Sequence, residues 1–179
     1  MVKKQLSAAQ GIEAACILFQ LNSRQADILR LAGEAGLPGD TVPDASRLRL
    51  CLEWQSFTHA VVTAGLMQHA PNSVLVGYLR ETGHLLAQAR GEAAPRAEQN
   101  SPSLAQADFV DGPFAAQMAL LGHGRQAECP GLFCQRLATD PLLTEAATDK
   151  RVEARLAAVM AMVISAVWDK LEQYEILAD

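Results

Sequence analysis

A chain of 179 residues can bury a substantial hydrophobic core, and its net charge of −5 gives no overall attraction to nucleic-acid phosphates. Half of the residues are hydrophobic but only 5% are aromatic, so Ala, Leu, Val and Met must build most of the core. This mixture favours closely packed helices over sheets. The many alanines and the excess of Arg over Lys are typical of GC-rich, bacterial coding. We therefore expect an all-α protein that does not bind nucleic acid.

Hydrophobic periodicity predicts four helices in the first half of the chain, at 7–21, 24–35, 44–68 and 74–90. Ser23 and Asp44 are typical N-caps for the second and third of these helices, and Gly36 is a typical helix end. The third helix has two apolar stripes on roughly opposite sides, one of which contains Trp54 and the other His59. Such a helix should be covered by other elements on both sides.

The segment 91–102 is the clearest linker, because it contains two prolines, mixed charge and no large apolar residue. After it, the pattern predicts short helices from Pro113 and from Leu132, a further helix start at Asp140, and a long final helix from about residue 148 to the chain end. No run of alternating residues indicates a strand. The chain is then a single all-α domain, 1–179, or two halves, 1–90 and 103–179, joined by the linker.

The final helix contains a run of thirteen residues, 156–168, whose only hydroxyl belongs to Ser165. Because apolar residues occupy more than one side of this helix, we expect it at the centre of an irregular bundle of five to seven helices. Ile164 and Val167, in its middle, should be buried on folding. Arg155 and Asp169 close the run well short of the about 20 residues that cross a bilayer, so no membrane span is predicted.

The N-terminal stretch and the cysteines indicate a cytoplasmic protein. An apolar patch follows the first two lysines, but Glu13 interrupts it and no small-residue cleavage site follows, which argues against a signal peptide. Four cysteines are spread along the chain, and two of them, Cys16 and Cys51, fall within apolar helical pattern. We interpret them as reduced thiols and not as a disulfide framework.

Two groups of residues have spacings that metal sites use. Glu81 and His84 match the Glu-x-x-His spacing of di-iron bundles, but such a site needs two of these pairs and the sequence has one. His123, Cys129 and Cys134 could supply three zinc ligands, but a structural zinc site needs four. A fourth ligand would have to come from Cys51 or a distant histidine. We expect neither a metal nor another cofactor.

Residues 22–32, NSRQADILRLA, resemble the opening of the response-regulator type of helix-turn-helix, which often carries a similar Leu-x-x-Arg and Leu-x-Leu pattern. That motif implies a short second helix and a basic recognition helix. Here a loop and a long apolar helix follow instead, with only Arg47 and Arg49 near its start. Asp27 and Glu34 would also repel phosphate. The sequence therefore favours an ordinary amphipathic helix.

His59 is the one titratable side chain that the pattern places among apolar neighbours, on the second stripe of the third helix. A histidine in such a place is more often a hydrogen-bonded core residue than a base or a ligand. No carboxylate lies on that face to build a triad, and no known nucleotide-binding or hydrolase motif is present. The sequence thus favours a protein that is not an enzyme.

Two functions remain open. The first is a non-enzymatic interaction protein, such as an adaptor, a chaperone-like factor or a subunit of a larger assembly, because the helices carry more apolar surface than one small bundle easily hides. Its protein partner, or a second copy in a homo-oligomer, could contact the end of the final helix, at Leu171, Tyr174 and Leu177. The alternative is a small-molecule-binding domain with a pocket near His59 and Trp54.

Overall fold

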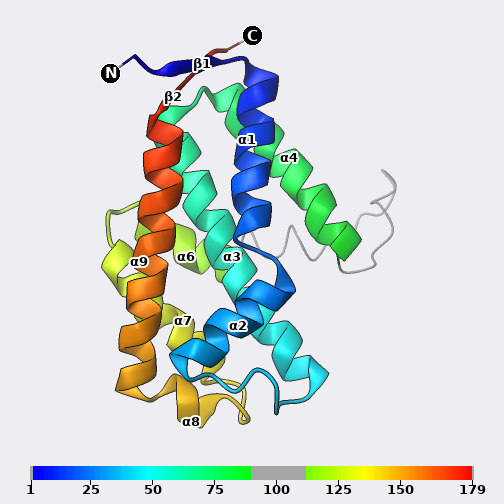
Figure 1. Ribbon diagram of the computed structural model, residues 1–179, viewed down its shortest axis with the longest axis vertical. Helices are drawn as coiled ribbons and strands as arrows, with labels where there is room; N and C mark the ends of the chain where they lie inside the picture. Colours follow the sequence, from blue (N-terminus) through cyan, green and yellow to red (C-terminus); the bar gives the residue numbers. More distant parts are fainter. Residues whose placement is uncertain (1, 90–111, 179) are drawn as a thin grey trace.

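The longest helix, α3 (Asp44–His69), runs through the middle of the molecule in the computed structural model (Figure 1). The structure describes residues 2–89 and 112–178, and the predicted linker 91–102 lies outside them. Buried hydrophobic side chains from both described stretches, from Leu6 to Ile176, belong to one core cluster. The two ends of the chain meet at the same end of the bundle.

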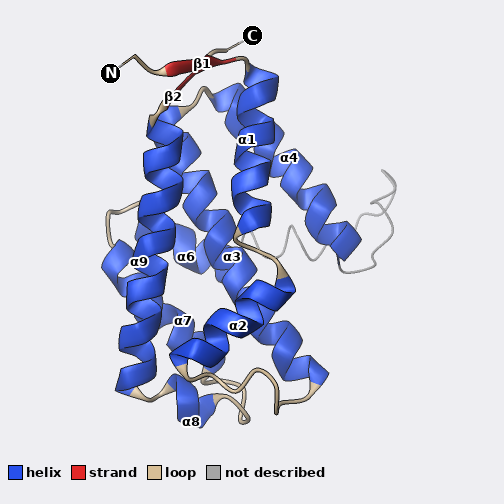
Figure 2. Ribbon diagram, viewed as in Figure 1, coloured by secondary structure: helices blue, strands red, loops and turns tan. Residues whose placement is uncertain are grey.

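The described residues form an all-α bundle, as the composition predicts (Figure 2). Its other α-helices are α1 (Ala8–Leu21), α2 (Gln25–Ala35), α4 (Asn72–Ala89), α6 (Pro113–Leu121), α7 (Cys129–Leu137), α8 (Thr144–Ala147) and α9 (Lys150–Glu172). A 3-10 turn, η1 (Gln126–Glu128), precedes α7, and two short strands, β1 (Lys4–Leu6) and β2 (Tyr174–Ile176), lie near the ends of the chain.

Local chemistry explains where several of the helices begin or end. Ser7 caps α1 through a reciprocal pair of hydrogen bonds with Gln10, and the Asp149 side chain accepts a hydrogen bond from the backbone at the start of α9. Pro113 occupies the first turn of α6, where its missing N–H costs nothing. Gly36 ends α2 with φ of 102°, a conformation that favours glycine. These boundaries lie within a few residues of the predicted ones.

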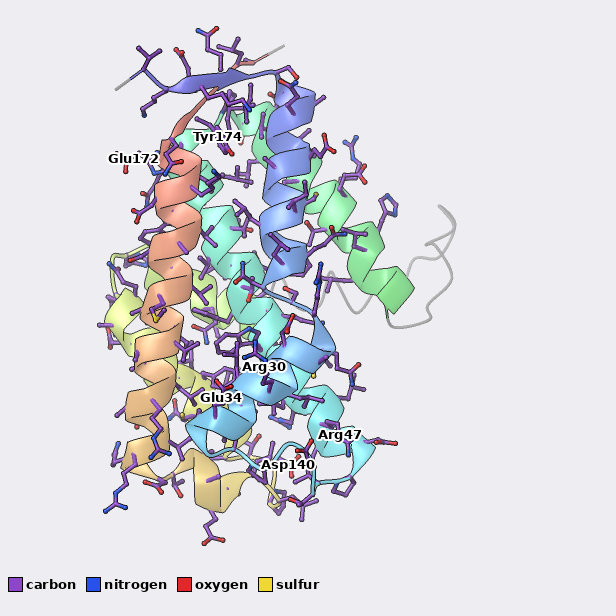
Figure 3. All side chains as sticks on the ribbon, viewed as in Figure 1. Arg30, Glu34, Arg47, Asp140, Glu172 and Tyr174 are labelled. Atoms are coloured by element: carbon purple, nitrogen blue, oxygen red, sulfur yellow. The ribbon has the colours of Figure 1, made fainter. Side chains whose placement is uncertain are left out.

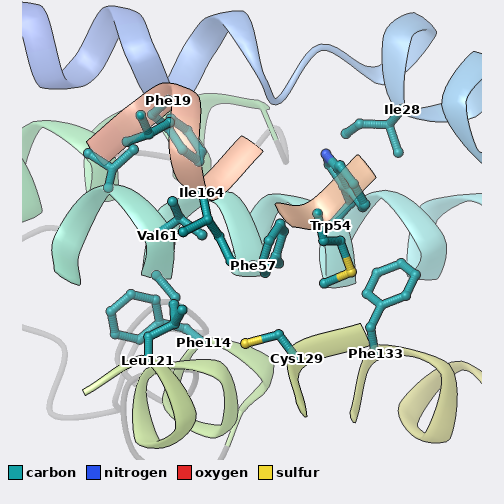
Figure 4. Packing of buried hydrophobic residues seen from close by; sticks show 14 of the residues in the cluster. Phe19, Ile28, Trp54, Phe57, Val61, Phe114, Leu121, Cys129, Phe133 and Ile164 are labelled. Carbon is teal, nitrogen blue, oxygen red and sulfur yellow. The ribbon is translucent and has the colours of Figure 1, made fainter. Parts of the chain in front are cut away.

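α3 is the central helix, and it is covered on both of its apolar sides as predicted. From Ser56 to Leu66 every one of its side chains is buried, and α1, α4, α6, α7 and α9 all contact it. In the close-up of Figure 4, Phe57 and Val61 of α3 lie between Phe19 of α1 and Phe114 of α6. Over this stretch, the apolar residues on both sides of the helix are thus matched by neighbours on both sides.

α9 lies at the side of α3 and not at the centre that the sequence predicts for it. One stripe of α9 is buried: Val152, Leu156, Met160, Ile164, Val167 and Leu171. The helices approach closely, because a Cβ atom added to Gly65 of α3 would lie 2.7 Å from Leu171 and 2.9 Å from Trp168. The Trp168 indole Nε1 donates a 2.9 Å hydrogen bond to the Val61 carbonyl. The predicted burial of Ile164 and Val167 is confirmed.

A two-stranded parallel sheet joins the ends of the chain, and here the predicted helix is wrong. α9 ends at Glu172, and β2 pairs with β1 so that Leu6 lies opposite Ile176. Both of these side chains are buried against the bundle, whereas the Gln5 amide donates a 3.0 Å hydrogen bond to Glu175 at the surface. Strands of three residues are too short to produce an alternating pattern, and their pairing spans almost the whole sequence.

No helix in residues 2–89 and 112–178 combines the length and the apolar character that crossing a bilayer requires.

Candidate functional site

The outward side of α9 is an apolar surface without charge. Within the run 156–168, the exposed residues are Ala158, Ala161, Met162, Ser165 and Ala166, which we call the α9 outer face. Met162 has 71% of its surface exposed. The two charged residues nearest to this face along the helix are Arg155 and Asp169, and both are exposed. A helix surface of this kind normally faces another protein element and not water.

The exposed hydrophobic residues of α1 have polar neighbours. Ile17 and Leu21 are about half exposed, but Glu13 and Gln20 are exposed on the same helix. Single exposed hydrophobic residues among polar ones are common on protein surfaces and need no explanation. The α9 outer face differs because its residues are contiguous over about two and a half turns of helix.

A groove of about 430 Å³ lies beside the α9 outer face, between α9 and the segment formed by η1 and the start of α7. Ala161 and Ser165 belong to both the face and the groove, and the partly buried Trp168 lines the groove further along. The remaining lining residues are Gln126, Ala127, Pro130, Ala157, Met160, Ile164 and Asp169. Together, the face and the groove present a shaped apolar surface with few polar groups.

The two ends of α9 carry opposite charge. Lys150, Arg151 and Arg155 outnumber Glu153 in its first two turns, and Asp169 and Glu172 outnumber Lys170 in its last. Lys150 pairs with Glu153 at 3.0 Å, but neither Arg155 nor Asp169 makes an ion pair within the described residues. These two side chains are therefore available to pair with charges on another molecule.

Other parts of the surface carry local ion pairs, and Arg30 and Glu34 of one such pair are labelled among the side chains of Figure 3. Arg30 and Glu34 form an ion pair along α2 at 3.4 Å, and Asp27 also lies near Arg30. A more buried pair joins α3 to α7, where the Arg136 guanidinium donates to Glu53 at 2.9 Å. Glu53 is almost fully buried, so this ion pair anchors α7 on α3 and has a structural role.

His59 is enclosed by aromatic rings, as a core residue would be. It is 3% exposed, and the rings of Phe19, Tyr78 and Phe114 lie with centroids 5.7, 5.4 and 4.5 Å from its own. Its Nδ1 shares a 2.9 Å hydrogen bond with the Tyr78 hydroxyl. Burial lowers the pKa of His59 to about 3, so the imidazole is neutral near pH 7.

Trp54, the other residue of the predicted pocket, is packed in a different part of the core. Its ring contacts those of Phe57 and Phe133, and its indole Nε1 donates a 3.1 Å hydrogen bond to the Asn22 carbonyl. The cavity beside Trp54 measures about 10 Å³, roughly the room that one water requires. His59 is not among the residues that line it. The geometry therefore offers little space for a ligand next to Trp54.

The three predicted contact residues at the end of α9 have separate environments. Leu171 is fully buried against α3, so it belongs to the core and not to an exposed surface, because α9 turns this side inward. Tyr174 lies in β2 and is partly exposed, with the Lys170 ammonium 5.4 Å from its ring centroid. Leu177 follows β2 and is 44% exposed. The structure does not bring the three together on one helix face.

The residues with metal-like spacing are also separated or buried. His84 is exposed on α4, and the exposed His123 shares a 2.6 Å hydrogen bond with the Ala119 carbonyl. Cys129 and Cys134 are buried, and burial, with a nearby carboxylate for each, raises the pKa of both thiols to about 11. In the described part of the chain, no group of three or more His, Cys, Asp or Glu side chains could hold a metal ion.

The stretch that resembles a helix-turn-helix forms α2 and the turn before it. A loop then leads to α3, which would have to serve as the recognition helix but is buried over most of its length. The Ser23 side chain does not cap α2: its hydroxyl is buried, and Arg24 is the N-cap residue. This part of the fold supports the reading of α2 as an ordinary amphipathic helix.

Of the α9 outer face, the sequence singles out only Ser165, as the one hydroxyl in the run 156–168, and it does not mark any of these residues as a contact. Periodicity indicates that apolar residues of this helix extend beyond the single stripe that packing on a core requires, but it does not tell which side of the helix stays exposed. The sequence signal that points to this face is the excess of apolar residues on the helix.

Comparison with known proteins adds no relative: no family model, no curated protein and no solved structure matches the chain.

Proposed function

We propose that this protein is a non-enzymatic interaction protein that binds a helix of its partner on the α9 outer face. The observation that carries the proposal is the charge-free, exposed surface from Ala158 to Ala166, with Met162 at its centre. Methionine is common at protein-binding surfaces, because its flexible, polarisable side chain adapts to different apolar partners. Arg155 and Asp169 would then form part of the polar rim that surrounds most interfaces.

The shape of the surface favours a helix as the bound element. Ala158, Ala161, Ser165 and Ala166 are small, so a second helix could lie close to the α9 backbone, at the 8–10 Å typical of packed helices. The outer face together with Arg155 and Asp169 spans fourteen residue steps, about 21 Å of helix. The groove beside it can receive side chains from the edge of the partner.

The non-enzymatic part of the proposal is supported by the environment of His59. Its imidazole is buried, neutral near pH 7 and enclosed by three rings, so it is suited to a place in the core. We do not propose the alternative of a small-molecule pocket at His59 and Trp54, because the cavity beside Trp54 has room for about one water.

The proposal can be tested with two matched variants. Met162→Lys places a charge in the α9 outer face, and Met67→Lys places the same charge at a methionine of α3 that is 60% exposed. Proteins retained by each tagged chain in extracts of its source cells would be identified, and their binding would then be measured with purified components. We expect Met162→Lys to weaken the binding of a partner at least tenfold, and Met67→Lys to leave it unchanged. Retained partners that bind both variants equally would contradict the proposal.

A further inference from the structure

The exposed residues along the middle of α9 have a spacing that reads the same in both directions. Arg155, Ala158, Met162, Ala166 and Asp169 follow one another at intervals of three, four, four and three residues, and all five are exposed. Intervals of three and four keep them on one side of a helix. Met162 lies at the midpoint of the series, with one alanine and then one charged residue on each side.

Such a stripe can complement a second copy of itself if the two helices are antiparallel. A twofold axis through Met162 would place each Met162 against the other, and each Ala158 against Ala166 of the second copy. The same axis would place Arg155 opposite Asp169 of the second copy, twice in the pair. A parallel arrangement would instead place arginine against arginine and aspartate against aspartate, which is unfavourable.

From this spacing and charge complementarity we propose that the occupant of the α9 outer face is a second copy of this chain, in an antiparallel helix pair centred on Met162. The proposal rests on the proposed function, because it identifies the partner for the same surface. The small residues permit the close approach that such a pair requires. Arg155 and Asp169 then gain the partners that they lack within the described part of one chain.

The size of the contact surface determines how tight a dimer we expect. A stable interface buries roughly 800 Å² on each partner, and a contact made by about 20 Å of one helix is smaller than this. We therefore expect a weak dimer, in exchange with the monomer at micromolar concentrations. Binding should weaken with added salt, because the two ion pairs at its edges are exposed to solvent.

Charge reversal tests both the contact and its direction. Arg155→Asp gives a chain with aspartate at both ends of the stripe, and Asp169→Arg gives a chain with arginine at both ends. Each variant alone should have a dimerisation Kd at least tenfold weaker than wild type, measured by sedimentation over a concentration series. An equimolar mixture of the two should form a heterodimer, because both opposed pairs are again of opposite charge. Arg30→Asp, a reversal at an exposed arginine of α2, should dimerise like wild type.

Other results would contradict the homodimer, the proposed function or both. A wild-type chain that stays monomeric at high micromolar concentration, or a mixture that does not associate, would overturn the homodimer. If a different purified protein still binds in a manner that Met162→Lys abolishes, the proposed function stands and only the identity of the partner is wrong. If neither self-association nor any partner depends on Met162, both proposals fail. Circular dichroism of each variant controls for folding, and these exposed substitutions should leave it unchanged.

Discussion

α3 and α9 are both long helices with apolar residues on more than one side, yet their surroundings differ. From Ser56 to Leu66, α3 has neighbours on all sides and its side chains are buried continuously. α9 has one buried stripe, while the side that contains Met162 faces solvent. The same type of sequence thus leads to a core helix in one place and to a candidate interface in another. The difference depends on which neighbours are present, and not on the helices themselves.

The largest effect should come from a charge placed on the buried side of either helix. Val61→Asp in α3 and Ile164→Asp in α9 each bury a carboxylate without a partner, at a cost of several kcal/mol, which is on the order of the stability of a small domain. We expect both variants to be unfolded or insoluble by circular dichroism and expression yield. Leu171→Asp belongs to the same class, because Leu171 is fully buried.

Met162→Asp is the matched control for these variants, since it introduces the same charge on the opposite side of α9. It should keep the helical circular dichroism signal of the wild type. If Ile164→Asp folded normally while Met162→Asp unfolded, the assignment of the two sides of α9 would be reversed.

The next effect concerns pH, because α3 buries a titratable group. The pKa of His59 is lowered to about 3, so between its ordinary value of 6.5 and about pH 3 the unfolded chain binds a proton at this position and the folded chain does not. Stability should therefore fall as the pH drops through this range, by about 1.4 kcal/mol per pH unit from His59 alone. Urea unfolding at pH 7, 6, 5 and 4 would measure this.

His59→Gln should lower stability at pH 7, but should also flatten the slope between pH 6 and pH 4. His84→Gln, at an exposed histidine of α4, should have the same slope as the wild type. Equal slopes for all three proteins would show that His59 is accessible to protons in the folded state.

A smaller effect is expected at the contact between the two helices. Gly65→Ala adds a methyl group at 2.7 Å from Leu171 and 2.9 Å from Trp168, which forces α3 and α9 apart. We expect a loss of about 1–2 kcal/mol in the free energy of unfolding, after the better helix propensity of alanine is included. Gly33→Ala on α2 is the control, because nothing lies within 4 Å of the added atom and the change should stabilise by up to about 1 kcal/mol. A stabilising Gly65→Ala would mean that the helices can separate without cost.

The smallest effect on stability should come from the α9 outer face. Met162→Lys should change the free energy of unfolding of the monomer by no more than about 0.5 kcal/mol, since exposed substitutions away from special features rarely do more. Thermal or urea unfolding at low protein concentration would measure it. A loss of several kcal/mol would show that this side of α9 is covered within the chain.

Much of the fold follows from local chemistry that can be recognised in the sequence. The all-α class follows from composition, and the helix ends follow from residues such as Ser7, Gly36, Pro113 and Asp149, whose effect reaches only a few positions along the chain. The burial of Ile164 and Val167 could also be predicted, because the middle of a strongly apolar stripe is buried in almost any packing.

Tertiary structure alone decided the rest. Periodicity does not specify which parts of the apolar surface other elements cover, so only packing shows that Leu171 is buried and that Met162 is exposed. The pairing of β1 with β2 depends on the two ends of the chain meeting in space, which no local pattern encodes. The candidate site has the same origin: periodicity indicates surplus apolar surface on α9, but the arrangement of α3, α7 and α9 determines where that surplus faces solvent.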